Sequence, residues 1–316
     1  MAINNAKISV IGAGYVGSTT AYALTLQKVA SEIILVDTNK DKARAEALDI
    51  AHATSALGDI SVSPGSYEDT KDSDIVVITA GIGPKYGESR LDIVNKNLKV
   101  FKSMVPEIIK YSPNALLLVV SNPVDILTYV TYKLSGFPKS RVLGSGTVLD
   151  TLRLKYAIEQ KYNLESKDID TIIIGEHGDS QVALWSQTTI HGIGIDSYFK
   201  AMNKEFQKEI KSEISDEVKK SGYDILHGKG YTNFGVALAV SRIIRAVIYD
   251  ENALLPVSSL YTGEYGIEDI CLGAPCMVGE IGVRRIFQIP IAKEELTQLE
   301  TSANSLKSLI KGLNII

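Results

Sequence analysis

Three polar segments of the sequence carry side chains that could act together in proton transfer and anion binding. His177 lies between glycines in "IIIGEHGDS", where an apolar, strand-like run ends. A lone histidine is more often a packing or surface residue, but catalytic groups in open α/β sheets gather where strands end. Asp150 and Arg153 in "GSGTVLDTLRLKY" share one helical face, although their spacing of three also fits a surface ion pair. Asn122 in "VVSNPVD" follows a strand and could be only part of a turn.

A nucleotide-binding pattern stands near the N-terminus. "GAGYVG" places Gly12, Gly14 and Gly17 as G-x-G-x-x-G after a strand and at the start of a helix, and Asp37 ends the next strand. In this motif the first glycine permits a tight turn, the second admits a pyrophosphate, and the third lets helix and strand pack closely. A carboxylate at Asp37 can accept hydrogen bonds from ribose hydroxyls and would repel a 2′-phosphate. The pattern therefore predicts NAD rather than NADP, against the alternative of a glycine-rich structural turn.

The elements that must position these side chains alternate in the first half of the chain. Apolar, β-branched runs are separated by helical patterns, which is typical of a parallel sheet covered on both faces. The runs that predict strands are 7–14, 31–37, 73–81 and 115–123, and helices are expected between them, one of them starting near Arg90.

This alternation ends near residue 150. We expect helices at 150–162, 203–226, 232–251 and 293–313, and strands at 169–178, 254–262 and 268–279. No linker composition separates the halves, so they should pack tightly. The predicted fold is α/β, with a Rossmann-type doubly wound parallel sheet at 1–145 that binds NAD, followed by an α+β catalytic and substrate domain at 146–316.

Composition limits the remaining possibilities. The chain has 316 residues, 45% hydrophobic and 22% charged, with a net charge of −4 and no basic block, which argues against a nucleic-acid partner. No signal-peptide pattern and no membrane-length apolar run is present. Cys271 and Cys276 match no zinc or redox spacing and are interpreted as reduced packing residues. We therefore expect a cytoplasmic location and no metal site.

Taken together, these segments resemble the L-lactate and L-malate dehydrogenase family. The resemblance covers nearly the whole chain, from "VIGAGYVG" through "AGIGPKYGESRLD", "SNPVDILTY", "GSGTVLDTLR" and "GEHGDS" to "GKGYTNFGVALA". It implies reversible hydride transfer between NADH and pyruvate, the L-lactate dehydrogenase reaction of glycolysis and fermentation. It also implies a cytoplasmic homotetramer that acts on small 2-oxo and 2-hydroxy acids.

The resemblance also implies a role for each matching residue. His177 would exchange a proton with the substrate oxygen, Asp150 would orient the imidazole, and Arg153 would bind the substrate carboxylate. The other implied substrate positions are Pro84, Arg90, Asn122 and Thr232. The implied cofactor positions are Gly12, Gly14, Val16, Gly17, Asp37, Lys42, Tyr67, Gly81, Ile82, Ser103, Val120, Ser121, Asn122 and Ser145. Asn97 is expected near both ligands.

The glycine-rich stretch "IGPKYGESR" resembles the mobile lid of this family. Its glycines would let it swing, and closure would bring Arg90 onto the substrate carbonyl while water is expelled. Position 84 carries proline, whereas lactate enzymes generally have glutamine there and malate enzymes arginine. Tyr86 is a further departure. An uncharged Pro84 predicts that pyruvate is preferred over oxaloacetate, unless Lys85 turns its ammonium group inward.

Regulation and substrate breadth are open at this stage. Many bacterial lactate dehydrogenases bind fructose 1,6-bisphosphate through an arginine and a histidine, but the matching positions here are Lys155 and Asp170, so we expect no activation. An alternative within the family is a broader L-2-hydroxyisocaproate-like enzyme, since Gly222 and Val236 would leave room for larger side chains. Malate dehydrogenase and a non-catalytic NAD-binding protein are less favoured alternatives.

Overall fold

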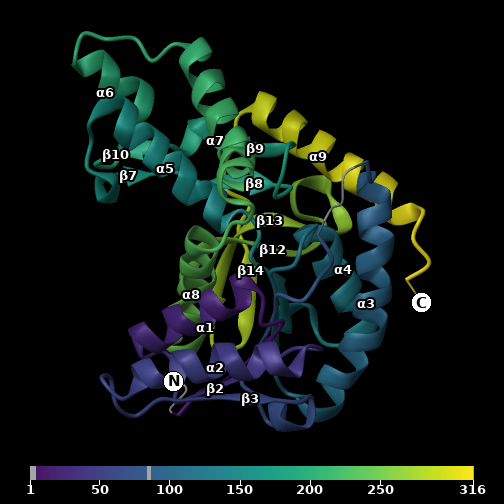
Figure 1. Cartoon of the computed structure of the whole chain (residues 1–316). Coiled ribbons are helices and arrows are strands. Elements are labelled where there is room, and N and C mark those ends of the chain that lie inside the picture. The colour runs from purple at the N-terminus through teal and green to yellow at the C-terminus, as the bar shows by residue number, and fades with distance from the viewer. Residues whose placement is uncertain (1–4, 84–86, 316) are drawn as a thin grey trace.

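The computed structural model describes residues 5–83 and 87–315. Within these ranges no helix is both long and apolar enough to cross a membrane. Figure 1 shows a sheet-centred body with helices packed around it and a smaller lobe that projects from one end.

Six parallel strands form the N-terminal half of the sheet, in the order β3-β2-β1-β4-β5-β6. The strands are β1 (Lys7–Ile11), β2 (Glu32–Val36), β3 (Ser61–Gly65), β4 (Ile75–Ile78), β5 (Leu116–Val119) and β6 (Val142–Gly144). The helices that connect them are α1 (Tyr15–Gln27), α2 (Lys40–Thr54), α3 (Arg90–Tyr111) and α4 (Val124–Ser135). β4 and β5 are buried along their whole length because helices cover both faces. The predicted α/β, doubly wound fold is confirmed.

This strand order has a topological switch point at the carboxyl ends of β1 and β4. The chain turns toward opposite edges of the sheet on either side of this pair, and ligands of open α/β sheets bind at such a point. The turns that follow these two strands carry the glycine motif and the start of the expected lid. The fold therefore places both segments at one edge.

The C-terminal half extends the same sheet with antiparallel strands. β12 (Ala253–Thr262) pairs with β6 through Ser258 and Gly144, and then with β13 (Glu268–Gly279). β8 (Ile173–Gly175), β9 (Gln181–Ala183) and β14 (Gly282–Ile286) complete an 11-stranded sheet. The covering helices are α5 (Val148–Tyr162), α7 (Lys208–Lys229), α8 (Phe234–Ile248) and α9 (Lys293–Lys311). The two halves thus share one continuous sheet.

The projecting lobe has its own small core. It contains β7 (Ile169–Asp170), β10 (Thr189–Ile190), β11 (Ile193–Gly194) and α6 (Ile195–Ala201), next to the outer ends of α5 and α7 (Figure 1). Phe199 and Phe206 stack with ring centroids 4.9 Å apart, and Tyr162 packs against both. Short 3-10 turns η1 (Glu68–Thr70), η2 (Lys139–Arg141), η3 (Ser166–Asp168), η4 (Trp185–Gln187) and η5 (Glu264–Gly266) join elements across the molecule.

Several expected elements differ from those observed. The single strand expected at 169–178 is divided into β7 and β8, which belong to different sheets. The helix expected from residue 203 begins only at Lys208. β3 was not predicted because its "SVSPG" sequence contains proline, which sheets tolerate at an edge, and β3 is an edge strand.

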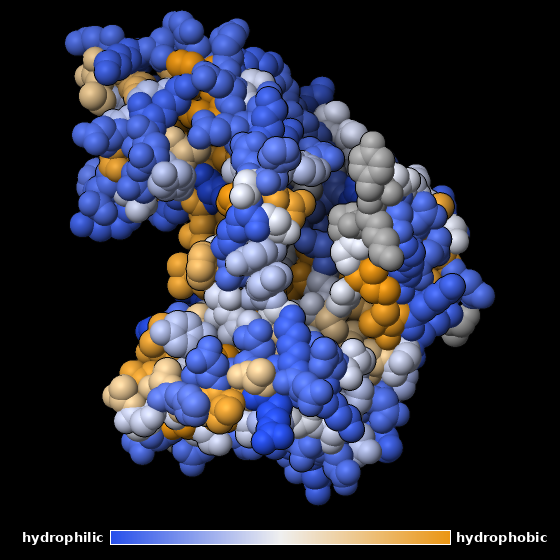
Figure 2. All heavy atoms as spheres, in the orientation of Figure 1, coloured by the Kyte–Doolittle hydropathy of each residue, from blue (hydrophilic) through white to orange (hydrophobic). Residues whose placement is uncertain are grey.

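One surface of the molecule exposes large hydrophobic side chains on three neighbouring helices. We call it the apolar helix face; it is formed by Tyr22, Leu26, Leu48, Phe234 and Leu238 of α1, α2 and α8. Figure 2 shows hydrophobic side chains gathered over this part of the body, below the recess under the projecting lobe. Phe234 is 72% exposed and Leu238 56%, so this face has no covering within the described part of the chain.

Candidate active site

The predicted catalytic histidine meets its expected partners where β8 ends. His177 follows β8 by two residues, and α5 begins with a turn that carries Asp150. His177 Nδ1 lies 2.5 Å from Asp150 Oδ2, and Arg153 Nη1 lies 3.2 Å from Asp150 Oδ1. The Asp150 carboxylate is buried, while the histidine and arginine side chains remain partly exposed. The structure thus makes a His–Asp–Arg chain from segments that lie 27 residues apart.

The pKa values of Asp150 and His177 are shifted in the directions that favour their charged forms. Burial by itself raises the pKa of Asp150, but the positive charges and hydrogen bonds of His177 and Arg153 outweigh burial and leave that pKa below its ordinary value. Burial by itself lowers the pKa of His177, and the carboxylates of Asp150 and Asp125 reverse this effect, so the pKa is raised. A raised pKa lets His177 keep its proton to higher pH than an ordinary imidazole, as a general acid requires.

Asp125 is a functional candidate that the sequence did not single out. It lies in the first turn of α4, 2% exposed, and its Oδ2 accepts the main-chain N–H of His177 at 2.8 Å. Its Oδ1 accepts the Ser258 hydroxyl at 2.6 Å. Burial raises the pKa of Asp125 to about 6, although both hydrogen bonds act to lower it. Asp125 stands in "SNPVD" beside Asn122, but no sequence signal connects it with His177 or Ser258.

Arg90 is the first residue of α3 and reaches the segment that carries the histidine. Ser89 and Asp92 form a capping box that fixes where this helix begins. The guanidinium of Arg90 pairs with Glu176, a carboxylate that is 1% exposed and directly precedes His177. The lid positions Pro84, Lys85 and Tyr86 lie outside the described residues.

Asn97 connects the start of the expected lid with the Asn122 segment. Its side chain is fully buried; Oδ1 accepts the Ile82 N–H at 2.7 Å, and Nδ2 donates to the carbonyls of Ile82 and Asn122. A Cβ on Gly81 would lie 3.1 Å from Asn97 Oδ1, so glycine allows the close approach. The Asn97 side chain therefore holds the start of the expected lid and the Asn122 segment together through hydrogen bonds.

Thr232 is half-buried just before α8. The next residue, Asn233, donates to Thr19 of α1 at 2.9 Å, and this bond attaches the Thr232 segment to the helix of the glycine motif. Asn122 lies two residues before α4, so both Asn122 and Thr232 stand shortly before a helix of the sheet-centred body.

The three motif glycines have different physical roles. A Cβ on Gly17 would stand 1.8 Å from the Gly12 carbonyl oxygen, and one on Gly12, whose φ is +108°, would meet the Ala80 nitrogen at 2.6 Å. Both positions are required by the fold itself. Gly14 differs, because a Cβ there would have no atom within 4 Å. The motif therefore presents open space at the position where a pyrophosphate would approach.

The start of α1 fits an anion. The helix has no side-chain cap at Gly14 and no acidic residue in its first turn, so its first N–H groups are available to a phosphate. Asp37 directly follows β2, and its carboxylate accepts the N–H groups of Ala13 and Asn39, each at 2.8 Å. The carboxylate is thereby fixed next to the glycine loop, where ribose hydroxyls could reach it. The residues present fit NAD.

Of the other expected cofactor positions, three lie at the carboxyl edge of the sheet, and Ser103 on α3 lies away from it. Val120, Ser121 and Ser145 lie at the carboxyl ends of β5 and β6, within the edge that carries Gly81 and Ile82. Further positions are Val16 in α1, Lys42 with its ammonium 5.5 Å from the Tyr15 ring, and half-buried Tyr67. Ser103 is exposed on α3, about 120° around the helix from Asn97, and the structure does not bring it to the others.

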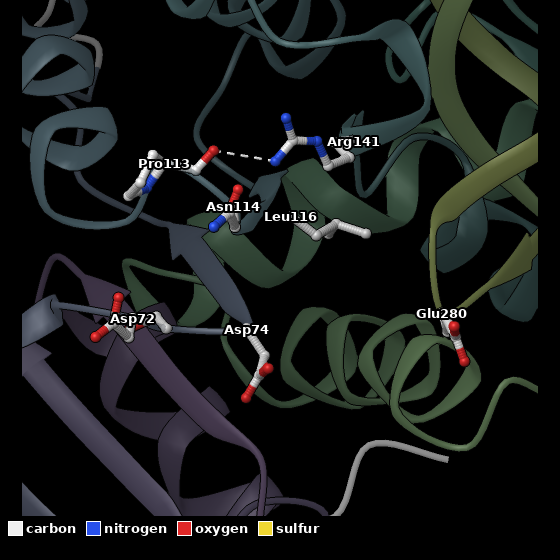
Figure 3. Close-up of a pocket in the computed structure, with 8 residues that line it drawn as sticks. Asp72, Asp74, Pro113, Asn114, Leu116, Arg141 and Glu280 are labelled. Carbon is white, nitrogen blue, oxygen red and sulfur yellow. Dashed lines mark hydrogen bonds between the residues drawn. The ribbon is translucent and has the colours of Figure 1, made fainter. Parts of the chain in front are cut away.

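A separate pocket of about 180 Å³ lies at the opposite, amino edge of the sheet (Figure 3). Asp74 and Leu116 mark the starts of β4 and β5, and Arg141 donates to the Pro113 carbonyl across the pocket. This pocket belongs to neither half of the candidate site. Within residues 5–83 and 87–315, no three His, Cys, Asp or Glu side chains are arranged to hold a metal ion.

Comparisons with known proteins agree with this geometry. Residues 6–144 match the family model of the lactate/malate dehydrogenase NAD binding domain, and residues 147–314 match that of the lactate/malate dehydrogenase alpha/beta C-terminal domain. The chain is 56% identical to an L-lactate dehydrogenase of Clostridium perfringens over 96% of both chains. It is 52% identical to L-lactate dehydrogenase 1 of Clostridium acetobutylicum, over 98% of this chain and 99% of the relative. The crystal structure of a minor L-lactate dehydrogenase from Enterococcus mundtii superimposes with a TM-score of 0.94 at 38% identity, covering 99% of each chain.

Proposed function

Since the chain belongs to the lactate/malate dehydrogenase family, we propose that the site described above catalyses reversible hydride transfer between NADH and pyruvate. The activity is that of an NAD-dependent L-lactate dehydrogenase, as in the relatives that are more than 50% identical. The observation that carries the proposal is the His177–Asp150–Arg153 chain.

In this proposal each side chain has one task. Arg153 binds the substrate carboxylate through its guanidinium, a two-pronged geometry that also orients a 2-oxo acid. Its bond to Asp150 is a single 3.2 Å contact, so the remaining N–H groups can point to the ligand. His177 donates a proton from Nε2 to the ketone oxygen as it becomes an alcohol, and takes the proton back in the reverse direction. Asp150 holds Nδ1 and stabilises the cationic ring.

The cofactor, when bound, supplies the hydride. We propose that the Gly14 turn and the first N–H groups of α1 receive its pyrophosphate and that Asp37 receives the adenosine ribose hydroxyls. The carboxylate at Asp37 also disfavours a 2′-phosphate by charge repulsion. The positions around Gly81, Val120 and Ser145 would hold the nicotinamide half, between the glycine motif and His177.

We also propose that the lid selects pyruvate. An uncharged Pro84 offers no partner to the second carboxylate of oxaloacetate, and an unpaired buried charge is costly. Arg90 would leave Glu176 on closure and polarise the ketone. A broader 2-hydroxy acid dehydrogenase stays the second candidate. A Cβ at Gly222 would lie 3.4 Å from a guanidinium nitrogen of Arg153, so glycine at this position leaves room for a larger substrate side chain next to the proposed carboxylate-binding group.

The enzyme is proposed to be a cytoplasmic homotetramer of glycolysis and fermentation that does not bind nucleic acid. The apolar helix face supports assembly, since contiguous exposed hydrophobic surface is typical of a protein–protein interface.

Two buried free thiols, Cys271 and Cys276, support a reducing compartment. Fructose 1,6-bisphosphate is not expected to activate it, because Asp170 is exposed and would repel a phosphate where Lys155 alone would attract one.

A panel of 2-oxo acids assayed with NADH tests the function. Pyruvate should be reduced with a higher kcat/KM than oxaloacetate or 4-methyl-2-oxopentanoate. Preference for 4-methyl-2-oxopentanoate would favour the broader enzyme, and preference for oxaloacetate would favour a malate enzyme. Absence of NADH oxidation with every acid would contradict the proposal. Sedimentation of the purified protein, with and without the bisphosphate, tests the assembly and its independence from the activator.

A further inference from the structure

Asp125 joins three segments behind the catalytic histidine. One carboxylate oxygen accepts the His177 main-chain N–H, and the other accepts the hydroxyl of Ser258 in the middle of β12. These partners lie 52 and 133 residues away along the chain. Both oxygens are therefore engaged, and the main chain at His177 is fixed to α4 and to the central sheet.

Hydrogen bonding alone does not account for a carboxylate at this position. An asparagine amide has nearly the same shape; its oxygen could accept the His177 N–H, and its NH₂ could donate to the Ser258 oxygen. Burying an ionised carboxylate, with the like charge of Asp150 acting on it, is unfavourable by comparison. Since an asparagine could make the same two hydrogen bonds, these bonds do not explain why a negatively charged side chain is present at position 125.

We propose that Asp125 is a positioning residue for the reaction: it fixes the main chain of His177 and adds a second negative charge near the imidazole, besides that of the ring-binding carboxylate of Asp150. The proposal rests on the proposed function, since it assumes that His177 exchanges a proton with substrate. Asp125 acts on the histidine from its main-chain side and Asp150 from Nδ1. Together the two carboxylates favour the protonated ring that ketone reduction consumes.

The other titratable groups that face Asp125 do not obscure this effect. They are Tyr261 of β12 and Cys271 of β13, both fully buried. Burial raises the pKa of each well above its ordinary value, so both stay neutral around neutral pH. Asp150 stays ionised because its pKa is lowered. Changes near neutral pH therefore concern His177 and Asp125.

The test compares the pH dependence of pyruvate reduction in the native enzyme and in Asp125→Asn. The substitution keeps both hydrogen bonds and removes only the charge, so the pH at which kcat/KM falls on the alkaline side should move to lower pH. The variant should lose about tenfold more activity near pH 8 than near pH 6, which corresponds to a fall of roughly one unit in the pKa of His177. NADH affinity, measured by fluorescence titration, should stay within about twofold of native because no cofactor contact changes.

Two further variants make the result decisive. Asp269→Asn is the same substitution at an exposed carboxylate that contacts α4 through Tyr129 and Lys133 without touching the histidine, and its pH profile should equal the native one. Ser258→Ala leaves the carboxylate of Asp125 but removes a hydrogen bond that lowers the pKa of that carboxylate. The pH profile of this variant should therefore move in the same direction as that of Asp125→Asn.

A uniform loss of activity in Asp125→Asn, with no movement of the profile, would overturn the proposal. If Asp125→Asn fails to fold, an unmoved Ser258→Ala profile overturns it. Lack of pyruvate reduction by the native enzyme would refute the proposed function instead.

Discussion

The charge of Asp125 should cost the folded protein stability, and the cost can be worked out from its surroundings. Burial raises the pKa of this carboxyl to about 6 from an ordinary 3.8. At about 1.36 kcal/mol per pH unit, this difference corresponds to roughly 3 kcal/mol. Because the folded-state pKa is raised, the folded protein holds the proton more tightly than the unfolded chain. The cost is therefore absent below about pH 4, grows as pH rises, and is complete above about pH 6.

Asp125→Asn removes this cost, so the variant should become more stable relative to the native protein as pH rises. The difference in free energy of unfolding should increase by about 3 kcal/mol between about pH 4 and pH 7. The assay is urea unfolding followed by the fluorescence of Trp185, the single tryptophan. Protein concentration is held fixed across the series because an assembly contributes to stability.

The slope of this difference with pH is more informative than its absolute value. Any constant change from altered hydrogen bonds shifts all points equally and leaves the slope unaffected. A difference that does not vary between about pH 4 and pH 7 would show that Asp125 is not a strained buried charge, and would refute the reasoning. Asp269→Asn serves as control and should give no such slope, since its side chain is mostly exposed.

Four further outcomes are expected. Gly14→Ala should fold normally, because its Cβ meets no atom within 4 Å, yet weaken NADH binding about tenfold or more in a fluorescence titration; unchanged affinity would remove the pyrophosphate from this turn. Pro84→Arg should shift kcat/KM from pyruvate toward oxaloacetate, and a native preference for oxaloacetate would implicate Lys85. Adding fructose 1,6-bisphosphate should leave the pyruvate KM unchanged, and a large fall in KM would show that Lys155 suffices to bind it. Pyruvate reduction should decline as pH rises through the raised pKa of His177, and a flat profile with chemistry rate-limiting would contradict the acid role.

The sequence predicted those parts of the fold that local pattern determines. The strands that became β1, β2, β4 and β5 are apolar runs of a kind that only a doubly covered sheet can bury, and the glycine motif has a local steric cause. β6 is only three residues long, and β7 and β8 are divided between two sheets by a turn. Such elements depend on pairing partners distant in sequence, which local periodicity does not encode.

The site followed the same division. His177, Asp150 and Arg153 were singled out by residue type, and the resemblance implied their roles; the structure brings them into contact. Asp125 was overlooked because its importance lies in contacts with His177 and Ser258, both far along the chain. The pairing of Arg90 with Glu176 could not be anticipated for the same reason.

The exchange of a proton between His177 and substrate is the central claim, and His177→Asn tests it most directly. The asparagine can still bond to Asp150, and the residues proposed to hold the cofactor are untouched, so NADH affinity should stay within about twofold of native. Single-turnover oxidation of bound NADH by saturating pyruvate should slow by about 10²–10⁴-fold, because the proton donor is lost. A variant that binds NADH normally and still turns over at more than about a tenth of the native rate would contradict the account.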